Sequence, residues 1–146
     1  MRINKSRMHT VIKVKTHQEK KAQQELKKIR DSKAKEQQEL NKLQDTHTSA
    51  TREAGRIAKA RADELASNRA FLHSLSSQIR KQETRVDEIS TEEDQKREEL
   101  IARSQSKQIV EKLDAKQREQ AAKEMERKEQ NVIDGHALRN RKGLTK

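Results

Sequence analysis

The chain has 146 residues, among them no Pro, Cys, Trp or Tyr, one Phe and three Gly, and it carries a net charge of +11. Charged residues make up 40% and hydrophobic residues 29%, whereas a globular domain is normally about half apolar. This composition excludes a compact layered core and leaves either disorder or long helices that share a narrow seam. Most of the chain consists of good helix formers, and no proline interrupts it.

The absence of cysteine excludes disulfides, thiol catalysis and cysteine-ligated metal sites. Residues 1–20 hold no apolar run of the kind found in a signal peptide, and no stretch is apolar enough to span a bilayer. We therefore expect a cytoplasmic protein that binds no cofactor.

The N-terminal half carries a heptad pattern that predicts a coiled coil, because about two thirds of its core positions are apolar over some seven heptads. The core positions are Met8, Ile12, Lys15, Glu19, Ala22, Leu26, Ile29, Lys33, Glu36, Leu40, Leu43, His47, Ala50, Ala54 and Ile57. A second apolar stripe comprises Leu65, Leu72, Leu75, Ile79, Val86, Ile89, Leu100 and Val110.

Between the two stripes, residues 46–51 are poor in helix formers and Gly55 follows them. We place helix 1 at about 5–54, a turn at about 55–63, helix 2 at about 64–138 and a flexible basic tail at 139–146.

Antiparallel partners have residue numbers with a nearly constant sum. Three apolar pairs sum to 118: Leu43 with Leu75, Ile29 with Ile89, and Met8 with Val110. The same sum sets residues 19–35, with a net charge of 7 − 3 = +4, opposite residues 83–99, with a net charge of 3 − 8 = −5. The sequence therefore predicts an all-α fold: one long antiparallel two-helix coiled-coil hairpin in which the C-terminal helix overhangs.

In this pairing, the first residue of helix 1 lies opposite residue 113, so residues 114 to about 138 have no partner. An apolar stripe nevertheless continues there, through Ala121, Ala122, Met125, Val132 and Ile133. Because a lone helix with an apolar stripe is usually short of a partner, we expect this stripe to dock on another protein; the alternative is a frayed, exposed end.

Three stretches resemble the family of the flagellar export protein FliJ. Residues 7–26 look like the family's opening helix, and residues 71–75, Phe-Leu-His-Ser-Leu, resemble its Phe-aliphatic-x-x-Leu stretch. The third is a C-terminal R-x-x-Q-x-x-φ-D-x-x-A-x-R spacing, formed by Arg127, Gln130, Ile133, Asp134, Ala137 and Arg139.

The resemblance implies a stalk-like coupling component of the flagellar type III protein export apparatus. Its partners would be the hexameric flagellar export ATPase, the cytoplasmic domain of the export gate protein and export chaperones, and it would associate peripherally with the inner membrane through them. Carried over by position, the gate-binding residues would be Leu43, Phe71 and Leu75. The ATPase-binding residues would be Arg127, Gln130, Asp134, Ala137 and Arg139.

The chain departs from the family pattern in two places. Thr46 and Ala50 stand where some relatives have aromatic residues, which predicts a differently built surface near the turn. Gly135 stands where an acidic residue often follows the Asp, and we expect it to end the helix. For Phe71, packing across the seam against His47 is an equal alternative to partner binding.

Other classes of function fit less well. The five histidines lack metal-ligand spacing, no phosphate-binding loop occurs, and exposed coiled-coil carboxylates have no cleft for acid–base chemistry, so we expect no enzyme and no small-molecule substrate. A non-flagellar type III secretion stalk is the nearest alternative. A basic nucleic-acid-binding or structural coiled coil is the alternative from another class, and we rank nucleic acid lower because residues 83–99 would answer the charge of residues 19–35.

Overall fold

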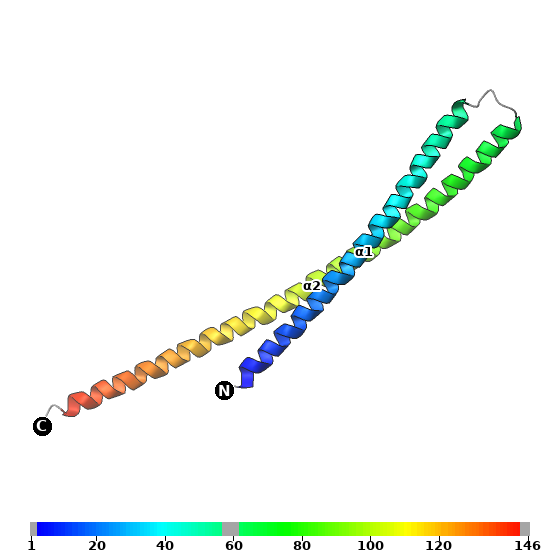
Figure 1. The fold of residues 1–146 in the computed structure, drawn as a ribbon. Coiled ribbons are helices and arrows are strands. Elements are labelled where there is room, and N and C mark those ends of the chain that lie inside the picture. Colours follow the sequence, from blue (N-terminus) through cyan, green and yellow to red (C-terminus); the bar gives the residue numbers. More distant parts are fainter. Residues whose placement is uncertain (1–2, 57–61, 144–146) are drawn as a thin grey trace. The chain divides into compact units, whose positions relative to one another are not determined.

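The computed structural model consists of two long helices, α1 (Ile3–Arg56) and α2 (Ala62–Gly143), which pack against each other in opposite directions (Figure 1). It describes the backbone of residues 3–56 and 62–143 and the side chains of residues 7–56 and 62–139, and every described residue is helical. The predicted all-α hairpin is confirmed. The middle of the expected turn, 57–61, and the end of the expected tail, 144–146, lie outside the described residues.

The threonine-rich stretch 46–51 is helical although its residues are poor helix formers. Thr46, Thr48 and Thr51 each donate a hydroxyl hydrogen bond of 2.8–2.9 Å to the backbone carbonyl four residues earlier. These bonds satisfy the hydroxyl groups within the helix, and α1 continues past them to Arg56.

The C-terminal helix is longer than the sequence predicts. α2 continues through Gly135 to Gly143, so the first part of the expected flexible tail is helical. No described glycine has a positive φ, and a glycine inside a helix costs only about 1 kcal/mol relative to alanine. Ala137, Leu138 and Arg139 follow closely and are good helix formers, which offset part of that cost.

The chain divides into two units, residues 19–102 and residues 1–18 with 103–146. Within residues 19–102, burial follows the predicted heptads of α1: every template position from 19 to 54 is buried or half-buried. On α2 the buried or half-buried positions include the whole predicted apolar stripe from Leu65 to Leu100. The buried apolar side chains are Ala22, Leu26, Leu40, Leu75 and Val86.

The register of the pairing differs from the prediction by four residues. Five cross-helix side-chain pairs have residue numbers that sum to 121 or 123: Arg30 with Glu93, Lys33 with Ser90, Glu25 with Lys96, Glu36 with Arg85 and His47 with Ser76. Two further pairs reach along the helices to either side of these values, Glu36 with Gln82 at 118 and Lys33 with Glu93 at 126. The helices therefore pair about a sum of 122, and the expected sum of 118 is wrong.

The cause lies in the spacing of core positions, which alternates between three and four residues. In an antiparallel pair, a three-residue step on one helix must face a three-residue step on the other, or the seam breaks. A sum of 122 satisfies this, because the step from Leu26 to Ile29 then faces the step from Lys96 to Glu93. A sum of 118 sets the four-residue step from Ile29 to Lys33 against the three-residue step from Ile89 to Val86.

Candidate partner-binding surfaces

A buried carboxylate lies in the middle of the α1–α2 seam, where the apolar pattern of α2 is interrupted. Glu93 is 6% exposed, and its two oxygens accept hydrogen bonds from Arg30 at 3.1 Å and from Lys33 at 2.9 Å. Arg97 donates a further bond of 3.0 Å from the same helix. The bonds from Lys33 and Arg30 lower the pKa of Glu93 to about 2, so its carboxylate stays charged at neutral pH.

Two smaller polar contacts flank this cluster. Lys96 lies between Glu25 of α1 and Glu99 of α2, at 3.0 and 2.9 Å. The hydrogen bonds to Glu99 and Glu25 raise the pKa of Lys96, while the bond from Lys96, with a smaller contribution from Lys21, lowers the pKa of Glu25. Toward the turn, Glu36 accepts a hydrogen bond of 2.6 Å from Gln82.

Three polar seam positions of α2 were not predicted from the apolar stripe. Gln82, Glu93 and Lys96 complete the alternating three- and four-residue steps of the second stripe, which the apolar residues alone leave with gaps. Extending those steps without regard to polarity would have located all three. Glu93 and Lys96 reach their partners on α1 in the observed register, so these two residues specify register more than they add stability.

The outer side of α1 carries a group of exposed lysines, which we call the lysine face: Lys20, Lys21, Lys27, Lys28 and Lys35. We expected residues 83–99 to answer the charge of this segment, and that expectation is wrong for the lysine face. Of the basic residues between 19 and 35, Arg30 and Lys33 are the ones paired with a described carboxylate of α2. The lysine face therefore remains as a solvent-exposed concentration of positive charge.

The structure places the three expected gate-binding residues in different environments. Leu75 is 5% exposed in the seam, and Leu43 is half-buried there. Phe71 is 49% exposed, so it is the one of the three whose side chain is open to a partner. His47 was the alternative partner for Phe71, but its Nε2 atom lies 3.2 Å from the hydroxyl oxygen of Ser76.

Beyond Asp114, every described side chain of α2 is exposed apart from the half-buried Gly135. Residues three, four and seven apart share a side of a helix, which divides this segment into two faces. Met125 and Val132, with Ala121, form an apolar face, and their exposed fractions are 58% for Met125 and 59% for Val132. The opposite side, which we call the polar face, carries four of the expected ATPase-binding residues, Arg127, Gln130, Asp134 and Ala137, together with the exposed Leu138.

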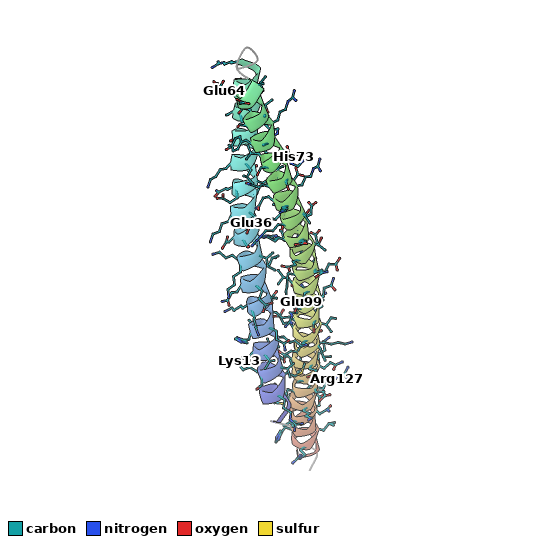
Figure 2. All side chains as sticks on the ribbon, turned by 90° about the vertical axis from the view of Figure 1, so that its right-hand side faces the viewer. Lys13, Glu36, Glu64, His73, Glu99 and Arg127 are labelled. Atoms are coloured by element: carbon teal, nitrogen blue, oxygen red, sulfur yellow. The ribbon has the colours of Figure 1, made fainter. Side chains whose placement is uncertain are left out.

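The fifth residue, Arg139, lies seven residues after Val132, so it belongs to the side of the apolar face. On the polar face, Gln130 donates a hydrogen bond of 3.3 Å to Asp134. Arg127, labelled in Figure 2, lies on the orange part of α2 and is exposed. The five expected ATPase-binding residues therefore do not share one side of the helix: four lie on the polar face and Arg139 lies on the side of the apolar face.

The described residues hold no group of three His, Asp or Glu that could bind a metal ion. Of the helices searched over those residues, none has the length and apolarity needed to cross a membrane.

The family described as "Flagellar FliJ protein" matches residues 4–142 of the 146-residue chain. No curated protein and no solved structure matches the chain.

Proposed function

The chain belongs to the flagellar FliJ protein family, and from that premise we propose that it is a stalk-like coupling component of the flagellar type III export apparatus. It would link the export ATPase ring to the export gate and receive export chaperones. Membership of this family places the chain among flagellar export proteins, and so favours that role over a stalk of a non-flagellar secretion system.

The observation that carries the proposal is the C-terminal segment of α2 after Asp114. Its side chains are exposed on all sides although Met125, Val132 and Ile133 are apolar. Leaving such side chains in water is unfavourable by roughly 25 cal/mol for each Å² that a partner could cover. A helix that keeps them is suited to being held by another protein.

In this proposal the hexameric ATPase holds the C-terminal segment of α2. The apolar face supplies most of the binding free energy, because its side chains lose water on contact. The polar face supplies orientation, since Arg127 and Asp134 offer charges that a complementary surface can pair. Arg139, on the side of Met125 and Val132, would contribute at the edge of the apolar contact.

The export gate would be met at the turn-proximal part of the hairpin. Phe71 is the natural centre of that contact, because it is aromatic and half exposed, and aromatic side chains commonly anchor interfaces. Leu43 and Leu75 would act from the seam, by holding α1 and α2 in the arrangement that presents Phe71. Such a coupling protein works by contact, needs no cofactor, and reaches the inner membrane periphery through its partners.

The test is co-purification of the full chain with the export ATPase and with the cytoplasmic domain of the gate protein from the same organism. We expect Met125→Ser with Val132→Ser to reduce capture of the ATPase by at least about tenfold, because two apolar contacts worth roughly 1 kcal/mol each are lost. Phe71→Ala should reduce capture of the gate domain and leave capture of the ATPase unchanged.

The matched control is Ile101→Ser with Ile109→Ser, which removes two exposed apolar side chains elsewhere on α2. It should leave both captures intact. If the unaltered chain captures neither protein, the coupling role is wrong. If the control weakens ATPase capture as much as the Met125 and Val132 changes do, the assignment of the apolar face is wrong.

A further inference from the structure

The lysine face has a regular geometry. Lys20 and Lys27 lie seven residues apart, as do Lys21, Lys28 and Lys35, and all five are exposed. Seven residues are two turns of the coiled coil, so these positions keep a constant side of α1 relative to the seam. At 1.5 Å per residue, each step is about 10 Å and the face is about 22 Å long.

The charge of this face is not neutralised within the described residues. Lys20, Lys27, Lys28 and Lys35 form no ion pair with a described carboxylate, while Lys21 helps to lower the pKa of Glu25. Glu25, which is paired with Lys96, and Asp31 are the two carboxylates between Lys20 and Lys35. Neighbouring lysines lie within about one Debye length, roughly 10 Å at ordinary ionic strength. Their potentials therefore add, and the face attracts anions as a unit.

The chemistry of the face points to a diffuse anionic partner. The only arginine between residues 19 and 42 is Arg30, and it is bound to Glu93. The lysine face therefore has no free guanidinium group, which is the group that forms paired hydrogen bonds with phosphates and bases. No aromatic side chain lies in this stretch, since Phe71 is the only aromatic residue of the chain, and base stacking is therefore not available. Lysines act instead as hydrated point charges on flexible stems.

We propose that the lysine face binds the surface of an anionic lipid bilayer, with this part of α1 lying along the plane of the headgroups. A straight, repeating row of charges meets a flat charged surface along its whole length, whereas it follows the curved backbone of a DNA duplex only over a short distance. Clusters of four to eight basic residues on a helix bind anionic membranes by this attraction. The binding is peripheral, because Gln24 and Ala34 lie among the lysines and no large apolar side chain is there to insert.

A second copy of the chain fits this face less well. The outer side of α2 carries exposed acids, Asp87, Glu88, Asp94 and Glu98, which could pair with the lysines of another copy. Because the basic and acidic sides belong to different helices of the same hairpin, such a contact would be head-to-tail and would not close into a dimer. A bilayer contact needs no such open-ended assembly.

The inference does not rest on the coupling role, and its test uses no export component. The full chain is sedimented with vesicles of phosphatidylcholine containing about 30% phosphatidylglycerol, and with vesicles of phosphatidylcholine alone, at roughly 0.1 M salt. The test variant is Lys20→Gln, Lys27→Gln, Lys28→Gln and Lys35→Gln together. The matched control removes the same charge from exposed lysines of α2: Lys112→Gln, Lys116→Gln, Lys123→Gln and Lys128→Gln.

We expect the unaltered chain to bind the anionic vesicles only, the test variant to bind at least about tenfold more weakly, and the control to change less than about twofold. Circular dichroism should show both variants to be as helical as the unaltered chain, since all eight side chains are exposed. The proposal is overturned if the anionic vesicles are not bound, or if the control loses as much binding as the test variant, which would mean attraction by net charge alone. It is equally overturned if the same four lysines govern tighter binding to duplex DNA, or concentration-dependent self-association without vesicles.

Discussion

Two regions of the chain, residues 19–102 and the segment of α2 after Asp114, are built from similar residues but differ in what their side chains contact. In the first, a buried or half-buried position recurs every three or four residues along both helices. In the second, Met125, Val132 and Leu138 are between 58% and 62% exposed. An apolar stripe in a helix therefore predicts that some partner covers it. Whether the partner is the other helix of this chain or another molecule is decided by how α1 and α2 pair.

The largest contrast between the two regions should appear on truncating a leucine in each. Leu40 is 6% exposed in the seam, so Leu40→Ala should lower the free energy of unfolding by about 2–4 kcal/mol, through lost burial and an unfilled space between α1 and α2. Thermal or urea unfolding of the full chain, followed by circular dichroism, measures this difference.

Leu138→Ala is the same substitution at a side chain that is 62% exposed. It should change the free energy of unfolding by less than about 0.5 kcal/mol. Equal effects of the two substitutions would mean that Leu138 is covered in the free protein, and the contrast between the two regions would fail.

A smaller, pH-dependent effect should come from the ion-pair cluster. The pKa of Glu93 is held at about 2, below the ordinary 4.5, by Lys33 and Arg30. A lowered folded-state pKa contributes stability above the ordinary value and loses it as pH falls through the folded-state value. The hairpin should therefore lose stability between about pH 4.5 and 2, and Glu93→Gln should be less stable than the unaltered chain at neutral pH and flatter across that window.

Glu98→Gln provides the control, because Glu98 is an exposed carboxylate on the same helix whose side chain forms no ion pair with a described residue. Its unfolding midpoint should follow that of the unaltered chain at each pH. If Glu93→Gln loses as much stability as the unaltered chain when the pH falls from about 4.5 to 2, the stabilising role given to the Glu93 carboxylate is wrong.

The alternating steps of Leu26, Ile29 and Leu40 predicted the two helices and their antiparallel pairing, because apolar periodicity is a property of the sequence itself. The register could not be obtained from apolar matches alone. Leu43 and Leu75 sum to 118 and are both seam residues, yet the structure sets Leu43 level with Ile79, four residues along. The cross-helix pairs of Glu93 and Lys96 fit this alignment, and the burial of these two residues becomes visible only when the partner helix is present.

The candidate sites divide in a similar way. Phe71 could be singled out from the sequence because it is the only aromatic residue, and the structure leaves it half exposed. The lysine face could not be anticipated, because the net charges of residues 19–35 and 83–99, +4 and −5, nearly cancel when the two blocks are added. Charge totals do not reveal which side of a helix each lysine occupies, and only Arg30 and Lys33 of the basic residues in that block point toward the carboxylates of α2.

The smallest predicted effect is a local one, at Gly135 in the exposed segment of α2. A methyl group placed there would meet no atom within 4 Å, and the backbone does not have a positive φ, so Gly135→Ala should fit without strain. It should stabilise the surrounding helix by about 1 kcal/mol, which slows amide hydrogen exchange of residues 131–139 by roughly fivefold. The midpoint of hairpin unfolding should stay unchanged, because the seam residues of 19–102 gain no contact. A raised midpoint would instead mean that this segment unfolds together with the seam, and the two regions would then form one cooperative unit despite their different burial.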